Sequence, residues 1–214
     1  MKILALDAAL GGFSAALDDG AAVRFEAGGA QDALETGLTR IEALLVAAGL
    51  RLGELDRIAV GLGPGSFTGV RIAVAYAKSL AYGSGVPLVG ISSYDALEPD
   101  DPPLPVLTVV HGRRGVVCAR LRAPGGARTA CGPTGRVLDE LLGPATGEIA
   151  VAGNTKDVLS EIAGRGWSVQ ALPPRADVPA LAIAQLARTR PPSPTPHALA
   201  PDYGEAPAVT QAKP

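Results

Sequence analysis

The feature that most constrains the fold is a run of three short apolar segments at the start of the chain. Residues 3–6, 13–17 and 21–27 each have the composition of a β-strand, and the Asp-Asp-Gly turn at 18–20 is a strong hairpin signal between the last two. Consecutive strands joined by tight turns must be antiparallel. A doubly wound nucleotide-binding fold alternates strand and helix from its first strand, so the sequence excludes that fold.

The pattern then changes from the period of a strand to that of a helix. Apolar residues recur at helical spacing over 34–48, with Gly49 as a stop, and again over 70–82. Strands are expected at 57–62 and 86–91. The predicted order is β-β-β-α-β-α-β, which matches the mixed sheet of the actin, hexokinase and Hsp70 (ASKHA) superfamily with its RNase H-like core.

Four prolines within residues 98–105 mark a boundary between two halves. We expect an α/β protein with two RNase H-like domains and mixed sheets, the first spanning 1–98 and the second, in abbreviated form, 106–190. In the second half strands are predicted at 106–110, 116–121, 149–152 and 167–171, with helices at 138–142, 155–163 and 179–188. Residues 191–214 are rich in proline and are predicted to form an extended tail.

Composition limits what the chain can bind by itself. Its formal net charge is −2, whereas an independent nucleic-acid binder usually carries a basic face that neutralises several phosphates. We therefore expect contact with RNA only through a partner. The opening Lys2-Ile-Leu-Ala-Leu-Asp7 is too short and too soon charged for a signal peptide, and no run of about 18 apolar residues occurs, so the chain is expected to be cytoplasmic with no membrane contact.

Histidine and cysteine give no sign of a metal site. The two histidines, His111 and His197, lie far apart in the sequence, and neither has a second ligand at helical spacing. The two cysteines, Cys118 and Cys131, lack a Cys-x-x-Cys spacing, which favours free thiols over a disulfide. We expect no bound metal, and no Ser/His/Asp triad can be assembled either.

A glycine-rich loop lies between a predicted strand and the helix at 70–82. It contains neither the Gly-Lys-Ser/Thr of a Walker A loop nor a complete Gly-x-Gly-x-x-Gly fingerprint, and Pro64 removes one amide donor. Two interpretations stay open, a tight structural turn and an anion site at the helix start. The loop residues are Gly63, Pro64, Gly65, Ser66, Phe67, Thr68 and Gly69.

This loop, continued through Val70-Arg71, resembles the signature of the TsaB family. The opening Ile-Leu-Ala-Leu-Asp7 and the segment Pro87-Leu-Val-Gly-Ile-Ser-Ser93 resemble the same family at matching spacing, and the likeness covers the first half of the chain. In the second half it weakens to Gly153-Asn154 and Pro201-Asp-Tyr203. Two polar motifs of the family are replaced here, by Ala33-Leu34 and by His111-Gly112-Arg113.

The resemblance implies a non-catalytic scaffold. Such proteins pair with the transferase TsaD, which makes N6-threonylcarbamoyladenosine in tRNA; the ATPase TsaE joins them, and without TsaD they form homodimers. The resemblance further implies that the isolated chain binds no cofactor, that ATP or ADP binds only at the composite complex, and that tRNA is reached through the complex. The competing hypothesis is a free-standing ATPase or small-molecule kinase of the actin-like superfamily; a peptidase is a third and weaker one.

The helix at 70–82 gives a separate reason to expect a partner. Its apolar residues sweep an arc of about 200°, whereas a helix that covers one sheet needs about 100°. The excess faces either another subunit or a neighbouring helix of the same domain. The first option agrees with the family, whose members pair through two helices. The expected interface residues are Leu34, Leu38, Ile41, Val70, Arg71, Ile72, Val74, Ala75, Tyr76 and Lys78.

Asp7 is the one acid in a position that actin-like enzymes use to hold a metal or water near a phosphate. The simpler interpretation is a carboxylate that accepts hydrogen bonds from the turn after its strand, and the sequence favours this one. We expect Asp7 to be a vestige of an enzyme site.

Overall fold

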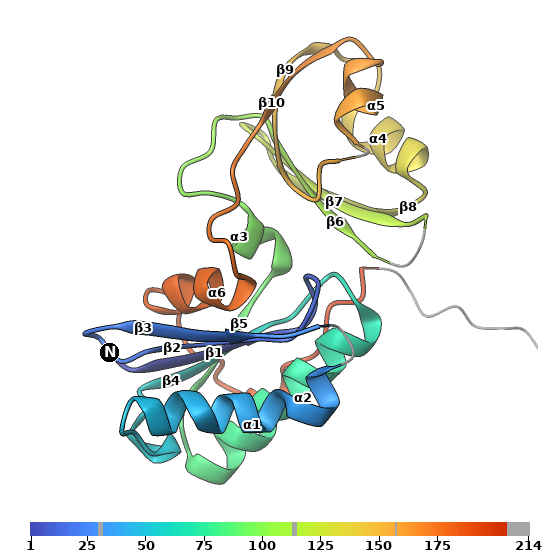
Figure 1. Ribbon diagram of the computed structural model, residues 1–214. Helices are drawn as coiled ribbons and strands as arrows, with labels where there is room; N and C mark the ends of the chain where they lie inside the picture. Colours follow the sequence, from blue (N-terminus) through green and yellow to red (C-terminus); the bar gives the residue numbers. More distant parts are fainter. Residues whose placement is uncertain (30–31, 113–114, 157, 205–214) are drawn as a thin grey trace, which may run out of the picture.

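The computed structural model describes residues 1–29, 32–112, 115–156 and 158–204. These residues form two mixed five-stranded sheets, one above the other in Figure 1, with helices on their faces. The described part of the chain contains no helix that is both long and apolar enough to cross a membrane. The α/β class and the two-sheet ASKHA-like architecture predicted from the sequence are confirmed.

The first sheet follows the predicted order of elements. Its strands are β1 (Ile3–Asp7), β2 (Ser14–Asp18), β3 (Val23–Ala27), β4 (Arg57–Gly61) and β5 (Leu88–Ile91). They lie in the order β3-β2-β1-β4-β5, with the first three antiparallel and β1, β4 and β5 parallel. Helices α1 (Asp32–Ala47) and α2 (Phe67–Ser84) cover one face, and the short 3-10 helix η1 (Leu52–Glu54) precedes β4.

The second sheet repeats this topology with shorter helices. Its strands are β6 (Val106–His111), β7 (Val117–Ala123), β8 (Gly126–Gly132), β9 (Gly147–Gly153) and β10 (Trp167–Ala171). Their order, β8-β7-β6-β9-β10, reproduces that of the first sheet, and so do their directions. Helices α4 (Thr134–Leu142) and α5 (Leu159–Ala163) lie on one face (Figure 1).

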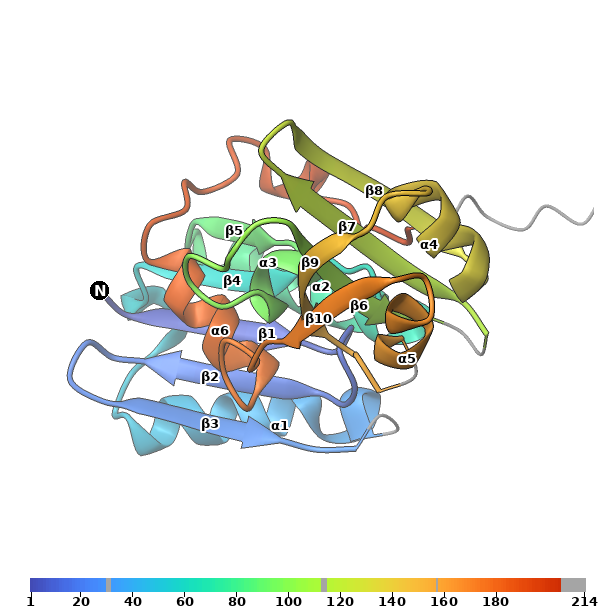
Figure 2. The ribbon, with the colours of Figure 1, turned by 90° about the horizontal axis from the view of Figure 1, so that it is seen from above.

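The helix that ends each half packs on the sheet of the other half. Helix α3 (Ser93–Leu97) contacts β6 and β9, while α6 (Pro179–Ala187) lies on β1, β2 and β4. In Figure 1 α6 lies between the two sheets, and in Figure 2 it is seen from above over β1 and β2. Helix α6 also contacts α3. The predicted division at 98 and 106–190 therefore does not follow the packing, because α6 completes the core of the first sheet.

The predicted tail is partly built into the fold. Residues 191–204, here called the C-terminal strap, include the 3-10 helix η2 (Pro196–Ala198) and run back along the first half. The amide of Ser193 donates to the Leu88 carbonyl at 2.8 Å, and the ammonium of Lys78 donates to the His197 carbonyl at 2.6 Å. Leu199 and Tyr203 pack against the first core. The strap thus covers edge strand β5, which would otherwise expose unpaired backbone groups.

Cys118 and Cys131 form a disulfide, so the prediction of free thiols is wrong. The two residues are direct partners across β7 and β8, with their Cα atoms 4.1 Å apart. Strand β8 itself was not predicted, because this edge strand is exposed over most of its length and has no alternating apolar pattern. Without β8 the register that brings the two cysteines together could not be inferred.

Candidate functional site: the glycine loop and the outer face of two helices

Asp7 ends β1 in the interior of the protein. Its side chain is fully buried, and the amide of Leu10 donates to Oδ2 at 3.0 Å, as the simpler interpretation of the sequence predicts. Oδ1 has no hydrogen-bond partner among the described residues. Burial raises the pKa of Asp7 to about 7, although the amides of Leu10 and Ala9 act in the opposite direction.

The residue of the neighbouring strand β4 that packs against Asp7 is Gly61. A Cβ atom at Gly61 would lie 2.1 Å from Oδ1 of Asp7, which no side chain can do. Asp7 and Gly61 are therefore packed directly against each other, and α6 contributes Ile183 to the same place. The carboxyl group is therefore enclosed by protein.

The glycine loop is packed just as closely onto the segment after β1. A Cβ at Gly65 would lie 2.2 Å from the Ala9 carbonyl oxygen, and a Cβ at Gly69 would lie 1.7 Å from that of Ala8. Ser66 caps α2: its hydroxyl accepts from the Gly69 amide at 3.2 Å, and its own amide donates to Ala9 at 2.8 Å. This packing supports the tight-turn interpretation, in which glycine is required for close approach of backbones.

The fold class implies a metal-bound nucleotide in its catalytic members, and these residues do not fit one held by this chain alone. The carboxyl of Asp7 is buried against Gly61, and the loop that would face a phosphate is packed on Ala8 and Ala9. Among the described residues no group of three or more His, Cys, Asp or Glu side chains is placed to hold a metal ion.

The start of α2 presents an exposed aromatic and cationic cluster. The guanidinium of Arg71 lies 4.1 Å from the ring centre of Phe67, and its Nε donates to the Tyr203 hydroxyl at 3.0 Å. The two rings are 4.9 Å apart. Because Tyr203 comes from the distant strap, this cluster was only weakly indicated by the sequence, through the segment Pro201-Asp-Tyr203.

The predicted interface residues separate into three groups by burial. Leu34 and Leu38 on α1 are 66% and 52% exposed, and Arg71 and Ala75 on α2 are exposed as well. Ile72, Tyr76 and Lys78 are partly buried. Three residues belong to the core and cannot contact a partner in this arrangement, so their inclusion is corrected: Ile41, Val70 and Val74.

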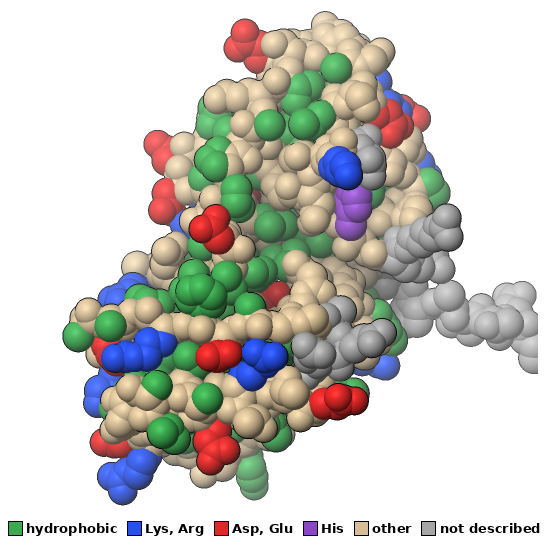
Figure 3. Space-filling view, viewed as in Figure 1, with side chains coloured by type: hydrophobic (Ala, Val, Ile, Leu, Met, Phe, Trp, Pro, Cys, Tyr) green, Lys and Arg blue, Asp and Glu red, His purple; other side chains and the backbone are tan. Residues whose placement is uncertain are grey.

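The exposed leucines lie on the side of α1 that faces α2. The opposite flank of α1 is fixed by Arg40, which contacts Glu26 and the Ala27 carbonyl on β3. On the α2 side, the Tyr76 hydroxyl donates to the carbonyls of Ala33 and Leu34 at 3.2 Å each. Tyr76, which we expected at the interface, therefore joins the two helices of the same chain through its hydroxyl. Figure 3 shows apolar side chains at the surface over α1, beside charged ones.

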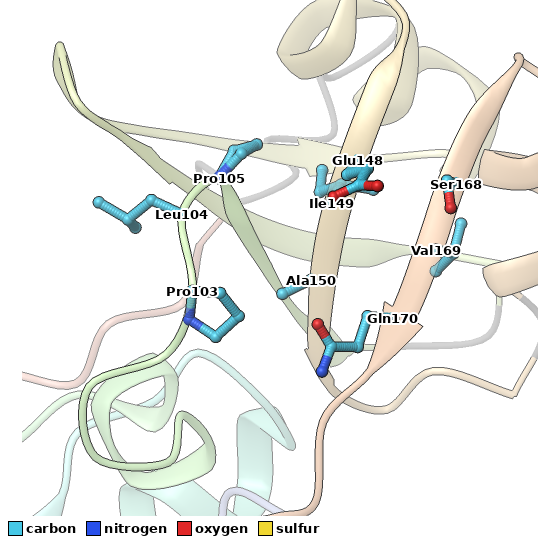
Figure 4. Close-up of a pocket in the computed structure, with 9 residues that line it drawn as sticks. All are labelled: Pro103, Leu104, Pro105, Glu148, Ile149, Ala150, Ser168, Val169 and Gln170. Carbon is cyan, nitrogen blue, oxygen red and sulfur yellow. The ribbon is translucent and has the colours of Figure 1, made fainter.

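Among the described residues, neither histidine side chain and no group of the second sheet adds to this site. His111 is exposed at the end of β6, and His197 is exposed in η2 of the strap. Arg113 lies outside the described residues. A cavity of about 240 Å³ opens beside β9 and β10, where the proline-rich linker passes (Figure 4). Its polar side chains, Glu148, Ser168 and Gln170, come from neighbouring strands and do not converge on one point in that view.

These observations define an ASKHA-like α/β protein whose strand-end carboxylate and glycine loop are closed by packing. A family model described as TsaD, tRNA N6-adenosine threonylcarbamoyltransferase, matches residues 30–163, and the chain belongs to this family. Within the family it is a TsaB/YeaZ-like protein, as the resemblance in the first half predicted.

The relatives support this assignment. A Haemophilus influenzae protein named tRNA threonylcarbamoyladenosine biosynthesis protein TsaB is 43% identical over 60 residues, which cover 28% of this chain and 25% of that one. The Escherichia coli protein of the same name is 38% identical over 95 residues, covering 44% of this chain and 41% of that one. The matches thus span between a quarter and two-fifths of these relatives' length.

Solved structures agree on the fold. YeaZ from Pseudomonas aeruginosa superposes with a TM-score of 0.68, covering 94% of this chain and 100% of that chain at 24% identity. A second structure, described as an uncharacterized protein with similarity to peptidase YEAZ from the same organism, gives the same TM-score over 95% of this chain and 99% of that one, also at 24% identity.

Proposed function

We propose that this protein is a non-catalytic scaffold subunit in the formation of N6-threonylcarbamoyladenosine in tRNA. It pairs with a TsaD-type transferase, and a TsaE-type ATPase joins the pair. The named relatives support participation in this pathway. The observation that carries the scaffold role is the exposure of two large leucines, Leu34 and Leu38, side by side on the outer face of α1.

The proposal places the partner across α1 and α2. Leu34 and Leu38 project beside α2, whose own outer face offers the small Ala75 and the partly buried Ile72. Small residues let a partner helix approach closely, and the leucines supply apolar area to bury. In the absence of a transferase the same face would pair two copies of the chain, and tRNA is reached through the complex.

The closed environment of Asp7 is the reason to assign no catalysis to this chain. The carboxyl group of Asp7 is packed against Gly61, and its pKa is raised to about 7. Such a group is a poor ligand for Mg²⁺, which binds ionised carboxylates. We therefore propose that ATP or ADP binds only where the subunits meet. Turnover of ATP by the isolated protein that disappears in Asp7→Asn would favour the kinase-like alternative instead.

The test introduces one charge on the proposed interface. Leu38→Glu should abolish co-elution with a TsaD-type transferase at micromolar concentration, since a carboxylate buried without a partner costs several kcal/mol. Its melting temperature should stay near that of the unchanged protein, because Leu38 is 52% exposed. Loss of tRNA modification by the reconstituted complex should accompany the loss of co-elution.

Phe25→Glu is the matched control. Phe25 is 51% exposed on β3, and strand alternation places it on the face opposite to Glu26, the residue that contacts α1 through Arg40. This variant should co-elute normally. If Leu38→Glu co-elutes as well as Phe25→Glu does, the outer face of α1 and α2 is not the interface.

A further inference from the structure

A polar cavity of about 540 Å³ lies at the hinge between the two halves, away from the helical face described above. Its walls are α3, the proline-rich linker, strand β7 and the segments before and after α6. Four guanidinium groups line it, two from β7 and one from each segment beside α6: Arg120, Arg122, Arg175 and Arg190. Clefts between domains are common places for small ligands.

Two carboxylates hold the inner part of the cavity together. Arg120 pairs with Asp95 and with Glu98, each at 2.7 Å. Glu98 also accepts from Arg122 at 2.6 Å and from the Thr108 hydroxyl at 2.5 Å, and its side chain is only 4% exposed. Each carboxylate is therefore shared among several donors, since Asp95 also pairs with Arg190 at 3.0 Å.

The charges of the cavity differ in their exposure to water. Arg120 and Arg175 are 14% and 10% exposed, and the inner carboxylates of Asp95 and Glu98 are 23% and 4% exposed. Arg122 and Arg190 lie further out, at 36% and 52%. The other two acids at the cavity, Asp100 and Asp101, are on the exposed linker, and the side chain of Asp100 is 90% exposed. Water screens exposed charges strongly, so these two acids compensate the guanidinium groups only weakly.

One hydrogen-bond donor of the cavity wall, the Nε atom of Arg122, is buried and has no hydrogen-bond partner among the described residues. Buried donors in proteins are almost always paired, and an unpaired one costs free energy. The side chain of Arg175 is 10% exposed, and among the described residues its one ionic partner is Asp100, which is 90% exposed. An ion pair with so exposed a carboxylate contributes little free energy, so another anion can replace Asp100 at little cost.

We propose that this hinge cavity binds a small dianionic oxyanion of the phosphate-monoester class. Such an anion would accept from Arg122, Arg175 and Arg190, and would replace the exposed carboxylate of Asp100 at Arg175. Arg122 belongs to the second sheet, whereas Arg190 follows the helix that covers the first, so the bound anion would fix the two halves relative to each other. This inference does not rest on the proposed function.

The test measures binding of inorganic phosphate to the full chain by titration calorimetry, at pH 8 and constant ionic strength. Arg122→Gln should weaken binding at least tenfold. Arg24→Gln is the control, since Arg24 is also 36% exposed and paired with one carboxylate, but lies on β3. Equal affinities of the unchanged protein and Arg122→Gln would overturn the proposal.

A second variant keeps the test decisive if Arg122→Gln does not fold. Asp100→Asn removes the exposed carboxylate that competes for Arg175, so it should strengthen phosphate binding several-fold with no loss of folding. Unchanged affinity in this variant would count against the site. Dimethyl phosphate, a singly charged diester like the backbone of RNA, should bind much more weakly; binding as tight as that of phosphate would refute the dianion.

Discussion

At the scale of single residues, Asp7 is a carboxyl group with no exposure to water. Burial raises its pKa to about 7 from an ordinary value of 3.8, so the folded protein holds a proton that the unfolded chain has released. Between these two pH values the folded state binds more protons than the unfolded state. The free energy of unfolding must therefore fall as pH rises from about 4 to 7, and the loss is complete above the folded pKa.

The first prediction concerns this pH dependence. From pH 4 to pH 8 the free energy of unfolding of the unchanged protein should fall by a few kcal/mol, because Asp7 becomes charged in the unfolded chain first. The Asp7→Asn variant has no charge at this position, so it should lack this fall. Denaturant unfolding of both proteins across this range is the measurement. If the stability curves of the two proteins stay parallel over this range, the pKa of Asp7 is not raised in the folded protein.

Sequence reasoning placed Asp7 correctly because a strand end is a local feature. It could not place the residues around Asp7, since Gly61 and Ile183 come from distant segments. The same limit explains the cysteines: Cys118 and Cys131 are partners only through the register of an exposed edge strand. A local pattern gives the position of a side chain along its element, but its neighbours depend on tertiary packing.

At the scale of elements, the wide apolar arc on α2 is covered in part by the protein itself. Tyr76 and the partly buried Leu80 pack within the protein, whereas Ala75 remains exposed. Lys78 donates to the strap, at 2.6 Å to His197 and 3.1 Å to Leu199. The periodicity predicted the helix and the excess of apolar surface, but not the strap that covers its other flank, because proline-rich sequence has no periodic pattern to indicate where it packs.

The second prediction concerns the junction of α1 and α2. The ring of Tyr76 lies edge-on to Phe13 with centroids 6.4 Å apart, and its hydroxyl binds the first turn of α1. Tyr76→Glu should lower the free energy of unfolding by several kcal/mol, because a charge would replace a packed ring. Tyr76→Phe keeps the ring and should cost about 1 kcal/mol. Chemical denaturation measures both; a Glu variant as stable as the Phe variant would mean that the ring is not packed between the helices.

At the scale of the whole molecule, the two halves have the same topology, but their cores are not separate. Helix α6 supplies Ala180, Ile183 and Ala187 to the cluster that covers one face of the first sheet. Helix α3 supplies Tyr94 to a cluster with Val110 and Cys118 of the second sheet. The order of elements could be predicted, since strands and helices leave periodic patterns. The exchange of α3 and α6 could not, because an apolar helix face does not specify which of two similar sheets it will cover.

This exchange leads to the last prediction, on the autonomy of the first domain. Residues 1–98 contain every strand of the first sheet, but without α6 the fragment exposes the sheet face formed by Ile3, Ala5 and Val89. Burial of each large aliphatic side chain there contributes about 1.5–3 kcal/mol, comparable in sum to the whole stability of a small domain. The fragment alone should therefore lack a cooperative thermal transition by circular dichroism, whereas the full chain should melt in one step.

Co-expression supplies the control that separates a missing helix from a fragment that fails for other reasons. Residues 172–204, produced together with 1–98, carry α6 and the strap, and they should restore a cooperative transition. In the full chain Ile183→Ala should lower the melting temperature without creating a second transition, since a cavity at the shared face costs about 2–5 kcal/mol and weakens a single cooperative unit. A fragment 1–98 that melts cooperatively by itself would show that α6 is an addition to a complete domain and not part of its core.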